Sequence, residues 1–465
     1  MKKTTFALFF GNRGFFPGEV IKEARERLAL ACQKNGYDYI MMDEKLTRYG
    51  AVETIEEGKI YAKFLEDNKG KYDGIILSLP NFGDENGAAV ALSDVDAPIL
   101  VHAFPDELDK MDFAHRRDSM CGKMAMCNVL RQMGIKYTLT KKFCPDPMSD
   151  AFSEDLAYFA SICRVYKGMC RVNIGAIGAR TTAFKTVRFD EIALQKKHIN
   201  IETIDMTVVF SMMENVDKDR LEEKKKKYLS IANFGTYPEI KLENISRLGA
   251  AIDELIEKYD LHAVALRCWD ELQKAYGISP CLILAELNER GIAASCELDI
   301  SNAVMMRAMT LAANFPVTLL DVNNNYGDSD EKVILFHCGN APVSYIKEEK
   351  GEIREHLMFK KSLGDGTGVG ITTGGSISCE VTIGSLKTEN GQIHSFVSEG
   401  KLTDDKLPAE FFGFGTVLEK EGLNDFLKYM ASNGYRHHVA LTKGNHANAI
   451  AEAFEKYLGY NIDRI

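Results

Sequence analysis

Two carboxylates stand in a stretch of sequence that otherwise has the character of a buried element. Glu297 and Asp299 lie in CELDI (residues 296–300), which follows RGIAAS and precedes the apolar, helix-like run SNAVMMRAMTLAANF. A charged carboxylate inside an apolar element costs free energy unless it is paired or binds a metal ion. Glu297 therefore predicts a partner from elsewhere in the chain.

Further ionisable side chains stand at the ends of other apolar runs. Asp321 ends PVTLLD, His337 follows VILF, and His437 and His438 come directly before the strand-like VALTK. Groups at the edges of buried elements can converge on one cleft, and oxygen-rich ligation with one imidazole suits Mn²⁺, Mg²⁺ or Co²⁺ rather than structural zinc. The alternative is structural: Asp321 caps a turn, and each histidine is a hydrogen-bonded core residue.

The elements that would position these groups follow from hydrophobic patterning. In the first two thirds of the chain, short apolar strands such as TTFALFF (4–10) alternate with amphipathic helices, which indicates parallel, doubly wound sheets. Later strand-like runs follow one another with Gly, Asn and Asp turns between them, which predicts an antiparallel sheet or small barrel. We expect an α/β protein with two doubly wound parallel-sheet domains (1–170 and 171–315) and a C-terminal, mainly antiparallel β domain (316–465) closed by a helix over about 445–458.

Two glycine-rich runs and one lysine run invite a ligand-binding interpretation. IGAIGAR (174–180) lacks the full GxGxxG spacing and the chain has no Gly-Lys-Ser/Thr, so we expect a strand-end turn and no nucleotide cofactor. GDGTGVGITTGGS (364–376) is expected to be a flexible loop. Lys224–Lys227 lie beside Glu222 and Glu223, which favours a solvated helix face over an anion site.

Composition excludes several classes of partner. The net charge of −10 argues against nucleic acid and against an anionic membrane surface, and no apolar run is long enough for a membrane-spanning helix. The opening MKKTTFALFF runs into Gly11 without a signal-peptide cleavage site, so a first strand is expected there. The 11 cysteines are scattered without a CxxC pair, which suggests reduced core residues and a cytoplasmic protein; a nucleophilic cysteine is the alternative.

Several runs of the sequence resemble the L-fucose isomerase and L-arabinose isomerase superfamily, most closely its fucose-isomerase-related branch, which some sulfoquinovose isomerases also resemble. They occur in the expected order over most of the chain: GNRGFFP, LRCW, GISPC, AASCELDISNAVMMRAM, PVTLLDVNNN, VILFHCGNAP and NGYRHHVALTKG. The resemblance implies an isomerase that interconverts an open-chain aldose and its ketose with a divalent metal ion, Mn²⁺ first, with Mg²⁺ or Co²⁺ as alternatives. It also implies a homo-oligomer, a hexamer by family resemblance, whose site is shared between subunits.

The resemblance assigns the metal site position by position. The glutamate of CELD, Glu297, matches a metal ligand that also acts as acid or base. The acid at the end of PVTLLD, Asp321, matches the second such residue. His438, before VALTKG, matches the imidazole ligand of the family.

Four further residues would contact the substrate on the same grounds. His437 matches a substrate-contacting position, Arg13 matches an arginine that reaches the sugar from a neighbouring subunit, and His337 aligns with a histidine ligand used only in the arabinose branch. Arg267 stands where many relatives are expected to have glutamine. Its planar cation suits a phosphate, carboxylate or sulfonate; the alternative is that Arg267 pairs with Asp270 or another acid.

The implied chemistry proceeds through a cis-enediolate, with a carboxylate removing one proton and a carboxylate returning it. A hydride shift between the two carbons is the competing route. The sugars left open are L-fucose, D-arabinose, L-arabinose and an anionic hexose such as sulfoquinovose. The competing functions are a metal-dependent aldolase or dehydratase acting on sugar acids, and a sugar-binding protein without catalysis.

Overall fold

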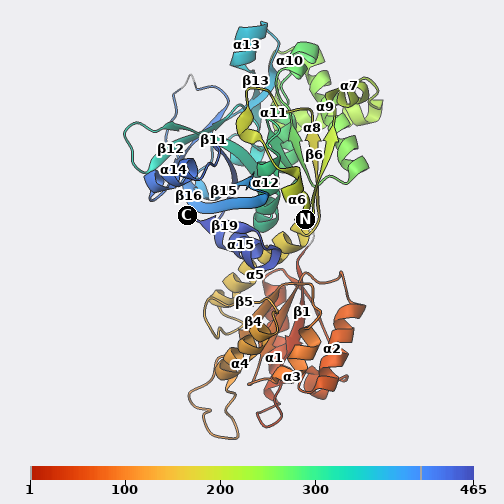
Figure 1. The fold of residues 1–465 in the computed structure, drawn as a ribbon, viewed down its shortest axis with the longest axis vertical. Helices are drawn as coiled ribbons and strands as arrows, with labels where there is room; N and C mark the ends of the chain where they lie inside the picture. Colours follow the sequence, from red (N-terminus) through yellow and green to blue (C-terminus); the bar gives the residue numbers. More distant parts are fainter. Residues whose placement is uncertain (1–2, 409–410) are drawn as a thin grey trace. The chain divides into compact units, whose positions relative to one another are not determined.

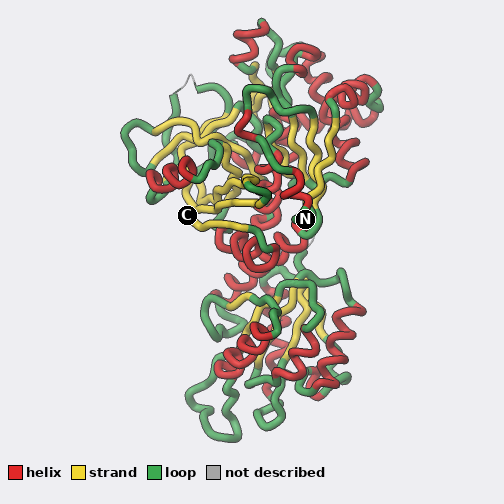
Figure 2. The backbone as a smooth tube through the Cα atoms, in the orientation of Figure 1, coloured by secondary structure: helices red, strands yellow, loops and turns green. Residues whose placement is uncertain are grey.

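The computed structural model describes residues 3–408 and 411–465 (Figure 1). Packing divides the chain into two compact units, Met1–Lys167 and Gly168–Ile465. The division into three domains stays a prediction. The α/β fold class is confirmed, because parallel sheets with flanking helices precede a sheet that is mostly antiparallel. Figure 2 shows the helices that flank the strands.

The first unit is a five-stranded parallel sheet in the order β2-β1-β3-β4-β5. Alternate side chains of β1 enter separate cores: Ala7 and Phe9 pack in one, while Phe6, Leu8 and Phe10 pack in the other. This period of two is what a strand covered by helices on both faces requires. The strands are β1 (Thr5–Phe10), β2 (Asp38–Met41), β3 (Gly74–Leu79), β4 (Ile99–Ala103) and β5 (Thr138–Leu139). The helices are α1 (Val20–Lys34), α2 (Ile55–Asp67), α3 (Glu85–Leu92), α4 (Ser119–Gln132) and α5 (Asp150–Met169), with a short 3-10 helix at Arg48–Gly50.

The second unit begins with a four-stranded parallel sheet in the order β10-β9-β6-β7. Ile177, Leu266 and Cys296, the last residues of three neighbouring strands, are paired in register. The loops that follow these strands therefore start side by side at one edge of the sheet. The strands are β6 (Val172–Ile177), β7 (Ile199–Ile204), β9 (Ala263–Leu266) and β10 (Ala293–Cys296). The helices are α6 (Glu191–Gln195), α7 (Met206–Glu214), α8 (Lys218–Ile231), α9 (Glu239–Tyr259), α10 (Glu271–Tyr276), α11 (Cys281–Glu289) and α12 (Ile300–Ala313).

The largest sheet of the second unit closes on itself. Its order is β15-β18-β11-β12-β17-β16-β19, and β15 also pairs with β16, so six antiparallel strands form a ring and β19 adds in parallel. Closure satisfies the backbone groups that an open edge would leave unpaired. The strands are β11 (Val317–Asn325), β12 (Lys332–His337), β15 (Cys379–Glu389), β16 (Gln392–Leu402), β17 (Phe414–Glu419), β18 (His438–Lys443) and β19 (Asn461–Arg464).

A small three-stranded sheet changes the expectation for one glycine-rich run. Residues 364–376 were expected to be a flexible loop, but β14 (Val369–Thr373) lies inside them and pairs with β13 (Gly351–Glu355). Glycine is required at Gly370, where a Cβ atom would lie 2.3 Å from the carbonyl oxygen of Ser279. The remaining elements are β8 (Ala232–Asn233), α13 (Leu357–Leu363), α14 (Leu423–Ser432), α15 (Ala447–Glu452), a π-helical turn (Ala453–Leu458) and 3-10 helices at Lys185–Val187 and Val343–Tyr345.

Two other local predictions need correction. The helix predicted over about 445–458 is present as α15 (Ala447–Glu452) and the π-helical turn that continues it to Leu458, but it is not the last element, because β19 follows and adds to the closed sheet. The lysine run is not solvated throughout: the Lys224 side chain is 9% exposed and its Nζ pairs with Asp253 at 2.6 Å and Glu286 at 3.1 Å. The helix-period pattern places Lys224 on the buried face of α8, where two acids from other helices neutralise it.

Candidate active site

The closed sheet brings Asp321 and His438 together as direct neighbours. They are partners in the antiparallel pairing of β11 with β18, and side chains of directly opposed residues project from the same face of a sheet. His438 Nε2 lies 3.3 Å from Asp321 Oδ1, with His438 fully buried and the Asp321 side chain 20% exposed. A pairing between strands more than 100 residues apart thus assembles two of the three expected ligands.

Glu297 comes to the same place from the parallel sheet. It follows the last residue of β10, and both Glu297 and Leu298 have a left-handed backbone, with φ of 59° and 60°. Non-glycine residues adopt this conformation at a cost, and such residues concentrate at functional sites. Glu297 Oε2 lies 3.0 Å from His438 Nε2, and Trp269 Nε1 donates a hydrogen bond to Glu297 Oε1 at 3.0 Å.

Asp299 explains why CELDI contains a second carboxylate. It is fully buried behind His438, whose Nδ1 donates to Asp299 Oδ2 at 2.9 Å. Arg436 Nη1 donates to Asp299 Oδ1 at 2.8 Å, and the Asn302 backbone N–H and side-chain amide also donate to this carboxylate. A carboxylate that holds one nitrogen of a histidine leaves the other nitrogen directed at the ligand position of a metal site.

The opposite charges in this group of residues stabilise one another's ionised forms. Burial opposes ionisation of Asp299, but Arg436 and His438 outweigh it and lower the pKa of Asp299 to about 2. Burial likewise opposes the charged form of His438, but the hydrogen bond to Asp299 and the nearby carboxylates of Glu297 and Asp321 raise its pKa to about 10. For Glu297, the charge of His438, whose Nε2 lies 3.0 Å away, and the hydrogen bond from Trp269 exceed the effect of burial and lower its pKa. The carboxylates therefore carry the negative charge that a divalent cation would require.

Several donor atoms of the cluster are free to bind a metal ion. In the described part of the chain, Asp321 Oδ1, His438 Nε2 and His337 Nε2 are buried without a hydrogen-bond partner of good geometry. Buried polar atoms are nearly always satisfied by protein, water or an ion. Two overlapping sets offer ligand atoms within 4.8 Å of one another: Glu297 with His337 and His438, and Asp321 with His437 and His438. Carboxylate oxygens with imidazole nitrogen fit a divalent ion such as Mn²⁺.

His337 enters the site from the end of β12, and its ring orientation bears on its role. Its Nδ1 accepts a hydrogen bond from the Cys338 backbone N–H at 2.9 Å. This places the proton of the neutral ring on Nε2, which is the unpartnered atom. A ring in this state donates a hydrogen bond, which favours contact with a sugar oxygen over metal ligation.

Aromatic side chains pack against the residues of the candidate metal site. Phe184 was not found from the sequence, yet its ring centroid lies 5.6 Å from that of His438, 5.7 Å from His437 and 5.8 Å from Trp269. His437 is 43% exposed and its Nε2 lies 3.8 Å from Asp321 Oδ1. Phe184 and Trp269 give the site an apolar wall that strengthens polar interactions beside it.

Arg267 is at the expected edge of the sheet, but its side chain is occupied. Its Nη2 pairs with Glu271 at 2.6 Å, its Nε donates to the Trp269 carbonyl at 2.9 Å, and its Nη1 donates to the Ala179 carbonyl at 3.1 Å. The acid that pairs with Arg267 is Glu271. Asp270, which was named as its expected partner, pairs with Lys274 instead. Arg267 therefore links the loops after β6 and β9. Its pairing with an acid was one of the two expectations, and its contact with an anionic group of the substrate stays a prediction.

Arg13 belongs to the first compact unit. There it pairs with Glu85, and its guanidinium lies 4.2 Å from the centre of the Phe82 ring. Asp84 also lies nearby, with its Oδ2 3.8 Å from Arg13 Nε. The contact of Arg13 with a sugar from a neighbouring subunit stays a prediction.

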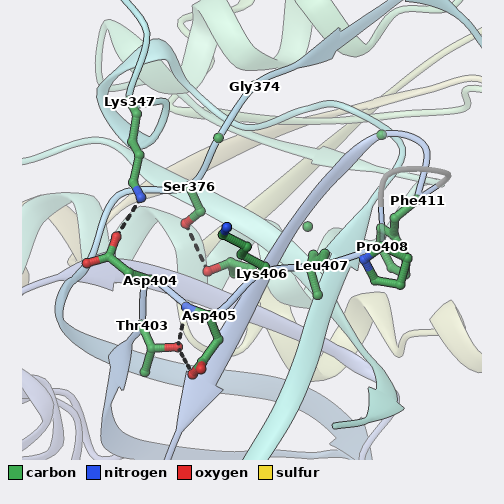
Figure 3. Close-up of a pocket in the computed structure, with 14 residues that line it drawn as sticks. Lys347, Gly374, Ser376, Thr403, Asp404, Asp405, Lys406, Leu407, Pro408 and Phe411 are labelled. Carbon is green, nitrogen blue, oxygen red and sulfur yellow. Dashed lines mark hydrogen bonds and ion pairs between the residues drawn. The ribbon is translucent and has the colours of Figure 1, made fainter.

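A separate polar pocket of about 310 Å³ lies on the closed sheet (Figure 3). Within it, Lys347 Nζ pairs with Asp404 Oδ1 at 2.5 Å, and Ser376 Oγ donates to Thr416 Oγ1 at 2.8 Å. Asp405 is taken up by Lys332 at 2.7 Å. The unpartnered polar atoms that suggest a bound ion are in the Glu297 cluster and not here.

A closed antiparallel sheet and a parallel α/β sheet thus bring two carboxylates, Asp321 and Glu297, to 3.3 Å and 3.0 Å from the same imidazole nitrogen, His438 Nε2. Such a cluster can bind a divalent ion and move protons between adjacent carbons of a sugar. The N-terminal domain model of the fucose/sulfoquinovose isomerases matches residues 7–170, and the C-terminal domain model of L-fucose isomerase matches residues 335–465. The chain belongs to this family of sugar isomerases.

Curated relatives extend the likeness over the central region. A sulfoquinovose isomerase of Alkalicoccus urumqiensis is 22% identical over 397 residues, which cover 84% of this chain and 85% of the relative. A sulfoquinovose isomerase of Priestia megaterium is 22% identical over 388 residues, which cover 82% and 83%. In the described residues, no helix combines the length and the apolar character needed to cross a bilayer.

Proposed function

We propose that this protein is a divalent-metal-dependent aldose–ketose isomerase acting on an open-chain sugar. The observation that carries the proposal is the approach of Glu297 and Asp321 to His438, where Asp321 Oδ1 and His438 Nε2 are buried without a hydrogen-bond partner among the described residues. Mn²⁺ is the ion proposed first, with Mg²⁺ and Co²⁺ as alternatives. When bound by these three side chains, the ion would act as a Lewis acid toward the carbonyl and the neighbouring hydroxyl of the sugar.

The carboxylates perform the proton transfers. One of Glu297 and Asp321 removes the proton from C2 of the aldose, and the electron pair of that bond moves to give a cis-enediolate. A carboxylic acid then returns a proton to C1, while the proton of the C2 hydroxyl is transferred to the oxygen on C1, so that the ketose has the same composition as the aldose. His337 Nε2 is suited to donate a hydrogen bond to a sugar oxygen, and Phe184 and Trp269 limit the access of water.

The relatives named sulfoquinovose isomerases make sulfoquinovose the first sugar to test. L-fucose, D-arabinose and L-arabinose are the neutral candidates. We also propose a homo-oligomer in which Arg13 of one subunit reaches the sugar held by its neighbour.

The test is an incubation of each sugar with Mn²⁺-loaded protein, followed by NMR. Formation of a ketose of unchanged mass supports isomerisation, whereas loss of water or cleavage to smaller products would assign a dehydratase or aldolase. Incubation in D₂O separates the routes, because an enediolate acquires solvent deuterium at C1 and a hydride shift does not. Binding of sugars without conversion would contradict the proposal.

A further inference from the structure

The loop that follows β6, residues 178–184, starts at the edge of the parallel sheet where Glu297 stands. Gly178 and Glu297 each come one residue after strand ends that pair with Leu266. The loop is held there because Arg267 donates a hydrogen bond to the carbonyl of Ala179. At its other end, Phe184 lies against His438. Both ends of this loop therefore border the proposed active site.

The loop contains a cation that no acid neutralises. Arg180 Nη1 donates to the carbonyl oxygens of Thr181 at 2.9 Å and Thr182 at 3.1 Å, and the ion pairs of the described residues include none for Arg180. Arg267 and Arg436, the other guanidiniums at this site, are paired with Glu271 and Asp299. Arg180 is half-buried, and a guanidinium in that position binds an oxyanion through a planar fork of donors.

The neighbouring residue offers a second polar group. Thr181 Oγ1 is buried and has no hydrogen-bond partner within the part of the chain that the structure describes. The turn that follows is closed by the Phe184 backbone N–H, which donates to the Thr181 carbonyl. A cation and an unpartnered hydroxyl thus lie in adjacent positions, on a loop fixed at both ends.

We infer that Arg180, with Thr181 beside it, binds a terminal oxyanion of the substrate: a sulfonate, a carboxylate or a phosphate on the carbon chain of the aldose. The inference rests on the proposed function, in which C1 and C2 of the open chain lie at Glu297 and Asp321. It assigns substrate charge recognition to Arg180 in place of Arg267, whose charge the protein itself satisfies. Arg180 is a specificity-determining residue and takes no part in the proton transfers.

The experiment compares charged and neutral sugars of the same configuration. Sulfoquinovose is measured against D-quinovose, which lacks the sulfonate, and D-glucuronate and D-glucose 6-phosphate distinguish the three oxyanions. In Arg180→Gln we expect kcat/KM for the preferred charged sugar to fall by at least about tenfold, mainly through KM, with less than about a threefold change for D-quinovose. Arg180→Lys should recover part of the loss, because it restores the charge but not the fork.

Arg188→Gln is the matched control, since Arg188 is an exposed arginine just beyond the same loop and also forms no ion pair among the described residues. It should leave both sugars unaffected. An equal loss for charged and neutral sugars in Arg180→Gln, or no loss for either, would overturn the inference.

Direct binding separates this inference from the isomerase proposal. Titration calorimetry with sulfoquinovose on metal-free wild-type protein and Arg180→Gln gives the affinity without turnover. If no sugar is converted but Arg180→Gln binds the charged sugar at least about tenfold more weakly, the isomerase proposal fails and the inference stands. Equal affinities, or no binding of any charged sugar by the wild-type protein, would end it.

Discussion

At the scale of single residues, the site depends on the division of work between Glu297 and Asp299. Two residues apart in sequence, one carboxylate faces the ligand position and the other lies fully buried behind His438. The left-handed backbone at Glu297 and Leu298 turns the chain between them. Substitution of each carboxylate is consequently expected to have a different effect.

Glu297→Gln should abolish isomerisation while the fold is retained. The amide is nearly isosteric but cannot accept the proton, so we expect kcat to fall by roughly 100-fold to 10,000-fold. The measurement is ketose formation by NMR, with thermal unfolding as the check on the fold. Activity within a few-fold of wild type would remove Glu297 from the chemistry.

Asp299→Asn should act through His438 and not through the substrate. The weaker hydrogen bond at Nδ1 lets the ring reorient, and we expect Mn²⁺ affinity to drop by about 10-fold to 100-fold. Arg436 also loses its counter-charge, which should lower the free energy of unfolding by a few kcal/mol, about 3 or more. Asp365→Asn is the control, because Asp365 pairs only with Lys360 at the surface. Unchanged Mn²⁺ affinity in Asp299→Asn would contradict the orienting role.

At the scale of elements, the hydrophobic pattern predicted which segments form strands and helices. It was less able to predict which strands pair with one another. Alternation and apolar runs suffice for parallel α/β sheets and for an antiparallel region. The contact of Asp321 with His438 depends on pairing β11 with β18, and local sequence carries no signal for such distant register. The three ligand candidates could nonetheless be named from the sequence, because they end apolar runs and match family motifs, and their role as metal ligands stays a prediction.

Other parts of the site could not be found in this way. Trp269, Phe184 and Arg436 act through packing or through a buried partner, and nothing in their local spacing marks them. Asp299 was visible in CELDI, but only the fold shows that it lies behind His438. Arg180 stands in a run taken for a simple strand-end turn, and its significance appears only once Arg267 is seen to be neutralised.

Gly178→Ala tests the close packing of the loop after β6 at the edge of the parallel sheet. Gly178 has a φ of +86°, and a Cβ atom there would lie 2.9 Å from Arg267 Cβ. We expect a loss of about 1–3 kcal/mol in unfolding free energy, because backbone strain and collision act together, with weaker turnover as the loop shifts. Gly391→Ala is the control, since its φ is +73° but nothing lies within 4 Å. Equal urea midpoints for the two variants would show that the contact with Arg267 contributes nothing.

At the scale of the whole molecule, the first compact unit contains a buried histidine whose pKa makes the stability of that unit depend on pH. The fully buried His102 accepts a hydrogen bond from Ser78 and donates one to the Pro145 carbonyl. Burial is the main cause that lowers its pKa to about 3. Below about pH 6.5 the unfolded chain binds a proton at this histidine and the folded chain does not, so stability falls as the pH decreases toward 3.

The contribution of His102 can be isolated by substitution. Between pH 6 and pH 4, this one group should lower the free energy of unfolding of the first unit by about 1.4 kcal/mol per pH unit. His102→Asn should be less stable near pH 7 but should show a shallower decline over that range, as followed by urea unfolding at each pH. Parallel pH profiles for the two proteins would contradict this assignment.

The proposed oligomer leads to a separate prediction for variants in the two compact units of the chain. If Arg13 of one subunit completes the site around Glu297 of another, Arg13→Ala and Glu297→Gln should each be inactive alone. Co-expressed, the two variants should regain a measurable fraction of wild-type turnover, because mixed assemblies contain some intact sites. No recovery in assemblies shown by mass spectrometry to be mixed would contradict a shared site.

The most direct test of the central claim is anomalous diffraction from crystals of Mn²⁺-loaded protein. The account predicts one strong manganese peak within coordination distance of Glu297, Asp321 and His438, with Asp299 outside that distance behind the histidine. A peak elsewhere, or a site from which any one of those three side chains is absent, would contradict it.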